Sequence, residues 1–224
     1  MRSLLLICLL ATCFFSCKKD ENPDNPNATS YINVAAGSTW NYQETNNDTG
    51  TPATSSYTVT STSRDTSISS KTYHIYDNSR GSHWYLNNSN GDYYQFDSLP
   101  GLLGNGVFDR LYLKTNLSAG QNWDQNVNLT IPNVPLPIPI TITNNIAEKG
   151  IAYTVNGTNY TNVIHVSTSI SSALIPSSSI TTSINSYYAD GIGLIENSTQ
   201  IDVDYLGIVQ NVNLQTKLLS SNLK

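Results

Sequence analysis

From Tyr31 to its end, the chain consists of short runs in which β-branched or aromatic residues alternate with polar ones. This period of two is typical of strands, because successive side chains of a strand point to opposite faces. Pairs such as Asn90-Gly91 and Asn156-Gly157 separate the runs and supply the positive φ of tight hairpin turns. The strand-like runs are Tyr57–Ser61, Lys71–Tyr76, His83–Leu86, Tyr93–Phe96, Leu111–Lys114, Val127–Ile131, Ile138–Thr143, Ala152–Val155, Val163–Ser167, Ile180–Tyr188, Gly193–Asn197 and Ile201–Leu206.

Helix-like spacing of apolar residues occurs in two stretches of this region. Leu99–Leu111 contains too many glycines for a long helix, and Gln215–Leu223 lies at the end of the chain. The sequence therefore predicts an all-β body that is mostly an antiparallel meander.

The three cysteines, Cys8, Cys13 and Cys17, all precede this body, which therefore has no thiol for a disulfide, a zinc site or a nucleophile. Charged residues make up only 12% of the chain. If residues 1–16 are removed, ten basic and sixteen acidic side chains remain and the net charge is −6. This acidic balance argues against a nucleic-acid partner.

The N-terminus has the organisation of a secretory signal peptide. Arg2 supplies a positive charge, Leu4–Phe15 forms an uncharged apolar run of twelve residues, and Lys18 begins a charged segment. A run of twelve is shorter than the roughly 20 residues of a transmembrane helix. We therefore expect export rather than membrane integration.

Phe14-Phe15-Ser16-Cys17 resembles the lipobox of bacterial lipoproteins, in which a small residue precedes the cysteine that becomes acylated. Leu10-Ala11-Thr12-Cys13 is a rival lipobox, but its use would leave Phe14 and Phe15 at the new N-terminus. The resemblance implies acyl chains such as palmitate on Cys17 and a membrane partner that these chains enter, since two or three chains bind far more firmly than one.

Lys19, Asp20 and Glu21 resemble the lysine-plus-two-acids export signal of outer-membrane lipoproteins from Bacteroidota. The resemblance implies a lipid-anchored protein on the cell surface. Alternatively, these three charges simply begin a solvated linker, and the protein faces the periplasm.

Three segments follow from this organisation: a lipoprotein signal peptide (1–16), the acylated cysteine with a flexible tether (17–30) and a β-rich body (31–224). The tether is rich in Pro, Asn and Asp and has no apolar periodicity. Within the body, Ala36–Trp40 is echoed by Ala119–Trp123, and later Tyr- and His-containing runs recur in the same order. The body can therefore be two pseudo-repeats, 31–115 and 116–224, or one continuous sheet.

Val34–Tyr42 and Tyr187–Glu196 resemble segments of uncharacterised β-rich lipoproteins of Bacteroidota, and faintly those of periplasmic lipoprotein carriers. This resemblance implies a curved sheet, a half-barrel or an open barrel, with an apolar concave face. The helices that fill this face in true carriers are not evident in the sequence.

Residues for chemistry are sparse. The histidines, His74, His83 and His165, lie in strand-like runs, and no serine-elbow motif accompanies them. Asp202 and Asp204 share one face of a strand but fit a solvated acidic stripe better than a metal site. We expect no enzyme activity, no metal and no cofactor.

Several aromatic and apolar residues are candidates for a binding surface. Trp84 and Tyr85 could form part of a stacking platform for sugars or of an apolar groove. In the proline-rich run Pro132–Ile140, the side chains of Leu136, Ile138 and Ile140 would point the same way in an extended strand. This run predicts an edge strand whose prolines block further pairing and whose apolar side chains face the core, or else a lip for an apolar ligand or partner.

The three residues Asp97-Ser98-Leu99 resemble the short O-glycosylation motif of exported Bacteroidota proteins, which would place a glycan on Ser98. Taken together, the sequence favours a non-enzymatic envelope lipoprotein that binds an apolar ligand or a partner protein through a concave β-sheet face. The alternatives are a glycan-binding accessory lipoprotein and a structural envelope protein.

Overall fold

The computed structural model describes residues 30–48, 50–97, 107–130, 137–205 and 207–224. Within these residues, twelve strands and a single 3-10 turn, η1 (Ser177–Ser179), account for the regular structure. The strands are β1 (Thr39–Asn46), β2 (Ala53–Ile68), β3 (Lys71–Asn78), β4 (His83–Ser89), β5 (Asp92–Asp97), β6 (Phe108–Lys114), β7 (Asn122–Leu129), β8 (Ile138–Val155), β9 (Thr158–Ser171), β10 (Ile180–Ala189), β11 (Gly193–Tyr205) and β12 (Ile208–Asn222).

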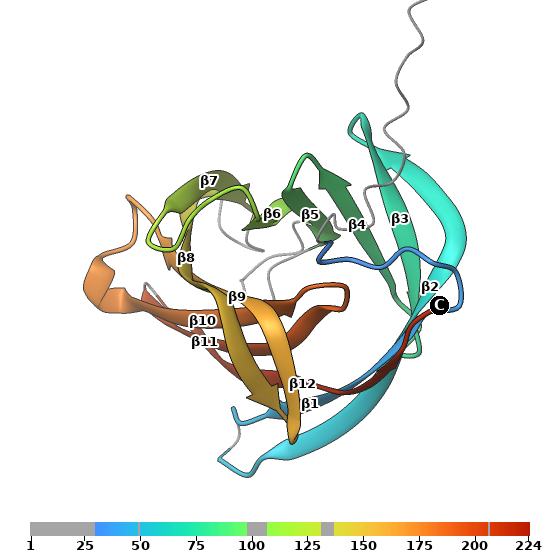
Figure 1. Ribbon diagram of the computed structural model, residues 1–224. Coiled ribbons are helices and arrows are strands. Elements are labelled where there is room, and N and C mark those ends of the chain that lie inside the picture. Colours follow the sequence, from blue (N-terminus) through green and yellow to red (C-terminus); the bar gives the residue numbers. More distant parts are fainter. Residues whose placement is uncertain (1–29, 49, 98–106, 131–136, 206) are drawn as a thin grey trace, which may run out of the picture.

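All twelve strands belong to one antiparallel sheet in the order β6-β5-β4-β3-β2-β1-β12-β11-β10-β9-β8-β7. Two meanders of six strands, β1–β6 and β7–β12, therefore lie next to each other and join through β1 and β12. The sheet curls until β6 and β7 approach each other, which gives a nearly closed barrel with one seam (Figure 1). The predicted all-β, curved antiparallel meander is confirmed.

The curvature coincides with irregularities in the ladders. Register shifts interrupt five pairings, among them β2–β3 between Ser61 and Asp65 and β10–β11 between Tyr187 and Tyr188. A bulge bends its strand and increases the local twist. Bulges therefore allow strands as long as β2 and β8, with 16 and 18 residues, to follow the wall of the barrel.

The helix-like spacing at residues 215–223 does not produce a helix. This segment belongs to β12, which pairs with both β1 and β11. Leu214, Thr216 and Leu218 alternate toward the interior, so the period of two determines the structure here as it does elsewhere.

The proline-rich run also differs from its prediction. Ile138–Ile140 begins β8, which lies between β7 and β9 and is not an edge strand. Pairing with β9 begins only at Thr141, and the carbonyl of Pro139 instead accepts a hydrogen bond from Ser172 Oγ at 2.7 Å. The missing N–H of Pro139 faces this unpaired side, so the ladder loses no bond.

The seam between β6 and β7 is bridged by side chains. Gln125 of β7 accepts a hydrogen bond from Leu111 N at 3.1 Å through Oε1 and donates one from Nε2 to Asp109 O. Trp123 Nε1 donates to Leu111 O at 3.0 Å. Two side chains of β7 thus occupy the backbone groups of β6 that a neighbouring strand would otherwise pair with.

The two meanders share several details. Trp40 is the second residue of β1 and Trp123 the second residue of β7, and both indoles are buried. His74 of β3 and His165 of β9 each place Nδ1 next to a carboxylate of the preceding long strand. The elements that suggested a repeat therefore occupy equivalent strands, β1 with β7 and β3 with β9.

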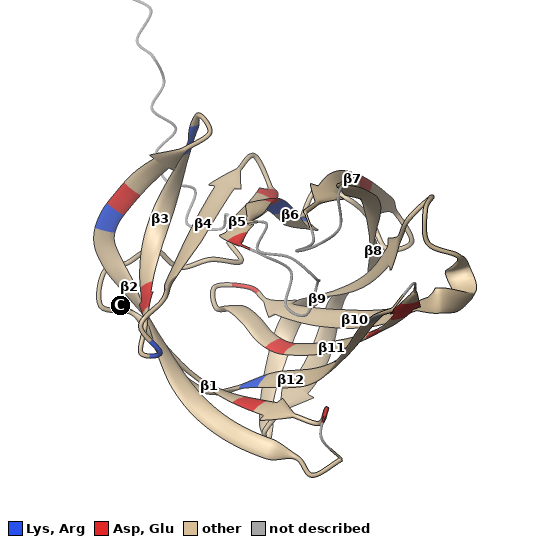
Figure 2. Cartoon of the chain, turned by 180° about the vertical axis from the view of Figure 1, so that it is seen from behind, with Lys and Arg blue, Asp and Glu red and all other residues tan. Residues whose placement is uncertain are grey.

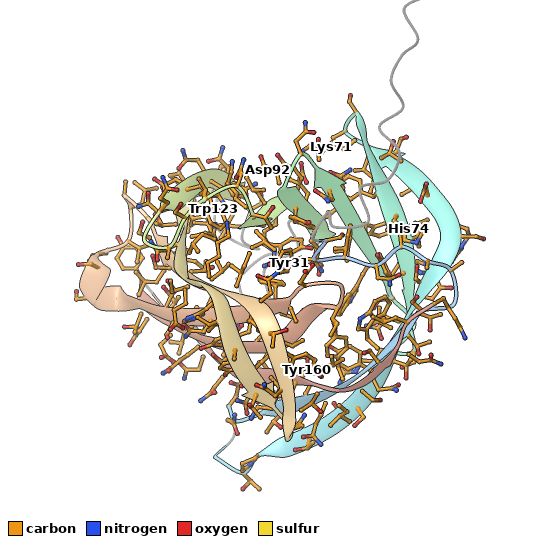
Figure 3. The ribbon with its side chains drawn as sticks, in the orientation of Figure 1. Tyr31, Lys71, His74, Asp92, Trp123 and Tyr160 are labelled. Carbon is orange, nitrogen blue, oxygen red and sulfur yellow. The ribbon has the colours of Figure 1, made fainter. Side chains whose placement is uncertain are left out.

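A segment of residues 30–35, here called the N-terminal strap, crosses the barrel before β1. Ser30 O accepts a hydrogen bond from Gly191 N (2.7 Å), and the N–H of the buried Tyr31 donates to Tyr93 Oη (3.2 Å). Tyr76 Oη donates to Asn33 O at 2.9 Å. Figure 3 shows Tyr31 near the middle of the barrel, so the strap ties β3, β5 and the β10–β11 turn together.

The charged residues are scattered along the described strands (Figure 2). The described part of the chain contains no helix that is long and apolar enough to cross a membrane. It also contains no group of three or more His, Cys, Asp or Glu side chains placed to hold a metal ion.

Candidate functional site

The barrel contains a cavity of about 260 Å³, bounded by β1–β6, β10–β12 and the N-terminal strap. Its wall consists of inward-pointing residues at alternate positions of each strand, such as Tyr57 and Val59 on β2 and Ser186 and Tyr188 on β10. Eight aromatic residues line this wall: Tyr31, Trp40, Tyr42, Tyr57, Tyr76, Trp84, Tyr112 and Tyr188.

Three of these rings form a compact cluster. Tyr42 and Tyr57 face each other across the β1–β2 ladder and stack with their centroids 5.5 Å apart. Trp84 of β4 lies 5.9 Å from Tyr42 and 6.2 Å from Tyr57. The hydroxyl of Tyr42 donates to Leu194 O at 2.9 Å. A rigid aromatic surface therefore faces the cavity.

Arg80, in the turn between β3 and β4, adds a positive charge that is already neutralised. Its Nη1 lies 2.8 Å from Glu44 Oε1, and its guanidinium lies 4.2 Å from the centroid of the Tyr57 ring. Burial raises the pKa of Tyr57 to about 12; nearby Glu44 raises it as well, and Arg80 opposes them. The Tyr57 ring therefore stays uncharged at neutral pH.

Arg110 of β6 is the second arginine of the cavity and has a different environment. Its Nη2 donates to Gln95 Oε1 at 2.6 Å, while its Nε is buried and has no hydrogen-bond partner. Among the described residues, no carboxylate lies within ion-pair distance of this guanidinium. Gln95 Nε2 donates to Asp97 Oδ2 at 3.3 Å, so the amide separates Asp97 from Arg110.

His74 takes part in a hydrogen-bond chain that resembles a catalytic triad. Its Nε2 lies 2.9 Å from Ser61 Oγ, and its Nδ1 lies 2.7 Å from Asp65 Oδ1. A nucleophilic serine must be reachable by the substrate, but Ser61 is only 1% exposed and lines neither the cavity nor the shallow pocket beside His74. In this structure a substrate cannot reach the hydroxyl.

His165 of β9 makes contacts that are equivalent to those of His74. Its Nδ1 lies 3.2 Å from Glu148 Oε2, its Nε2 lies 2.9 Å from Asn185 Oδ1, and its ring stacks on Tyr187 at 4.3 Å. Both carboxylates lie next to a register shift, in β2–β3 and in β8–β9. The shared position indicates that these carboxylate–histidine pairs stabilise bulged segments of the barrel.

The predicted binding residues do not lie together. Trp84 lines the cavity, whereas Tyr85 points to the opposite face, where its ring lies 6.2 Å from that of His83. Ile138 and Ile140 are buried in a separate apolar cluster and do not line the cavity. A shared platform of Trp84 and Tyr85, and a ligand lip that includes the two isoleucines, are therefore wrong.

The remaining predicted sites lie outside the described residues. They are the acylated Cys17, the export signal Lys19, Asp20 and Glu21, the glycosylation candidate Ser98, and Leu136. These sites stay predictions.

The cavity also uses residues that the sequence did not single out. Arg110 precedes the strand-like run Leu111–Lys114, and Tyr42 and Glu44 lie in β1, whose polar residues obscured its alternation. The available signal was the spacing Arg110–Tyr112, which places an arginine on the same strand face as a tyrosine.

Comparison with known proteins gives little further information. No protein-family model matches the chain, and no curated protein is significantly similar to it. Among solved structures, the chain is similar to one described as a "putative lipoprotein" from Parabacteroides distasonis ATCC 8503, with a TM-score of 0.48 and 12% sequence identity over 87% of this chain and 99% of the other. A likeness this distant carries no argument about function.

Proposed function

We propose that the protein is a non-enzymatic, lipid-anchored envelope protein that binds a small molecule inside its barrel. The observation that carries this proposal is the cavity of about 260 Å³ with eight aromatic side chains on its wall. Large apolar walls with a few placed polar groups are the usual composition of small-molecule sites.

The size and the polarity of the cavity limit the ligand. Ligand pockets commonly measure roughly 300–1,000 Å³, and a cavity of about 260 Å³ is slightly smaller than that range. Arg110, Gln95 and Asn197 line it together with the rings, and buried polar groups require hydrogen-bond partners. A compact amphipathic molecule therefore suits the site better than a lipid with several acyl chains.

Glycan binding on an exposed platform of Trp84 and Tyr85 has less support than this proposal. Trp84 faces the interior while Tyr85 faces outward, so the two rings cannot stack on one sugar chain. An envelope protein with a purely structural role would bind nothing in the cavity, and the experiment below separates it from the proposal.

Acylation of Cys17 would give the protein its membrane partner. The twelve residues 18–29 lie between this cysteine and the strap, and the predicted flexible tether would have an end-to-end distance of about 20 Å at that length. The barrel would then lie close to the membrane surface. With Lys19, Asp20 and Glu21 as the export signal, that surface would be the outside of the outer membrane.

Ligand binding can be tested by native mass spectrometry of the detergent-solubilised protein after exposure to membrane and cell extract. We expect a small-molecule adduct on the wild type, its loss in Trp84→Ala and its retention in Tyr85→Ala, which removes the neighbouring ring from the outer face. Circular dichroism verifies that both variants are folded. No adduct on the wild type, or equal loss in both variants, would contradict the proposal.

The anchor needs its own test. Metabolic labelling with radioactive palmitate should label the wild type and Cys13→Ser but not Cys17→Ser. Labelling of Cys17→Ser would show that the other lipobox is used. Protease digestion of intact cells, compared between the wild type and an Asp20→Ala/Glu21→Ala variant, checks the surface location: only the wild type should be digested.

A further inference from the structure

We propose that the cavity ligand is a small organic carboxylate, whose anionic group binds Arg110 and whose body lies against the aromatic wall. This inference rests on the proposed function and specifies the chemical class of the ligand. It is carried by the hydrogen-bonding state of Arg110.

The guanidinium of Arg110 has five N–H donors in a fixed plane, and among the described residues it makes one hydrogen bond, from Nη2 to Gln95. Its Nε is buried without a partner. A buried, unpaired donor on a charged group is costly, and a guanidinium pairs best with a carboxylate through two parallel hydrogen bonds. A carboxylate that accepts from Nε and from the neighbouring Nη would therefore satisfy this donor.

The other charged groups of the cavity wall do not form an ion pair with Arg110. Arg80 is already paired with Glu44 at 2.8 Å, so neither of these two groups is available to a ligand charge. Asp97 lies beyond Gln95, whose amide directs its oxygen to Arg110 and its N–H₂ to Asp97. Arg110 is thus the arginine of the cavity wall that has no ion pair among the described residues.

The sheet register places an aromatic surface at a suitable distance from this charge. Arg110 pairs with Gln95 and Gln95 pairs with Leu86, so two strand spacings separate Arg110 from β4. Neighbouring strands are about 4.8 Å apart, which makes this distance about 10 Å. Trp84 lies two residues before Leu86 on the same face and also lines the cavity. A molecule with a carboxylate at one end and a flat or apolar body fits between them.

The experiment compares matched pairs of probes on the full-length protein in detergent. Each pair has one body with either a carboxylate or a neutral group: 2-naphthoate with 2-naphthamide, indole-3-acetate with indole-3-acetamide, and decanoate with decanol. Binding is measured by tryptophan fluorescence and calorimetry. For at least one pair we expect the carboxylate to bind at least tenfold more tightly.

Two variants assign this preference to Arg110. Arg110→Met should abolish it while retaining the binding of the neutral probe, whereas Arg64→Gln should leave it unchanged. Arg64 carries the same charge but pairs with Asp77 on the exposed surface. Arg110→Met also removes the hydrogen bond to Gln95 Oε1, so circular dichroism verifies that this variant is folded before its binding is compared.

The outcomes separate the two proposals. If no probe of any pair binds and extracts give no adduct, the cavity is not a ligand site and the proposed function fails. If neutral probes bind as tightly as their carboxylates, or if Arg110→Met retains the preference, ligand binding stands and the carboxylate inference is overturned.

Discussion

The seam between β6 and β7 leads to a quantitative prediction about Gln125. Replacing it by alanine removes the hydrogen bonds that its amide makes with Leu111 N and Asp109 O. Each such bond contributes roughly 0.5–1.5 kcal/mol, so the expected loss is about 2 kcal/mol in the free energy of unfolding. With a urea dependence of about 3 kcal/mol/M, the unfolding midpoint should fall by about 0.7 M.

Urea denaturation followed by tryptophan fluorescence measures this loss, and hydrogen exchange at the Leu111 amide locates it. Gln200→Ala is the matched control, because the amide of Gln200 bonds only to Asp202 at the surface of the described structure. Its midpoint should change little. If Gln125→Ala matches the control in stability and leaves the exchange of Leu111 unchanged, side-chain bridging does not close the barrel.

Three further predictions concern titration, the strap and the serine. Burial raises the pKa of Tyr57 to about 12 from an ordinary value of 10.0. The free energy of unfolding should therefore be unchanged below pH 10.0 and should fall as the pH rises toward 12. Urea unfolding midpoints measured across this pH range test the prediction, and a constant midpoint would contradict it. Gly193→Ala should cost about 1–3 kcal/mol, because φ is +98° and a Cβ would lie 3.0 Å from Tyr31 O. Gly50→Ala, with φ of +74° and an open environment, should cost less, and equal urea midpoints would refute the strap contact. Buried Ser61 should resist a serine-reactive fluorophosphonate in the folded protein, and stoichiometric labelling that Ser61→Ala abolishes would reveal an accessible nucleophile.

The sequence predicted the strands well wherever alternation involved apolar residues. Lys71–Tyr76 lies in β3 and Ile180–Tyr188 lies in β10, as expected. It did not predict β1 or the first half of β7, because the outward residues there are polar and the inward ones include Glu44 and Gln125. Glu44 points into the cavity and Gln125 bridges the seam. Both environments exist only after the sheet has curled, so the pattern of a single strand does not predict them.

The binding residues illustrate the same limit. The alternation rule alone separates Trp84 from Tyr85, since adjacent residues of a strand point to opposite faces. In contrast, the contact of Arg110 with Gln95 depends on the register between β5 and β6, which includes a bulge after Tyr93. Local patterns in the sequence do not determine that register.

The order of the strands has a consequence for folding kinetics. Of the eleven strand pairings in the described chain, ten join strands that are consecutive in sequence, and only β1–β12 joins distant ones. Local pairings close small loops and form quickly, whereas a distant pairing must first overcome a large loop entropy. The two meanders can therefore form independently, and the pairing of Thr39–Asn46 with the end of the chain is expected to be the late, rate-limiting event that turns two ribbons into one barrel.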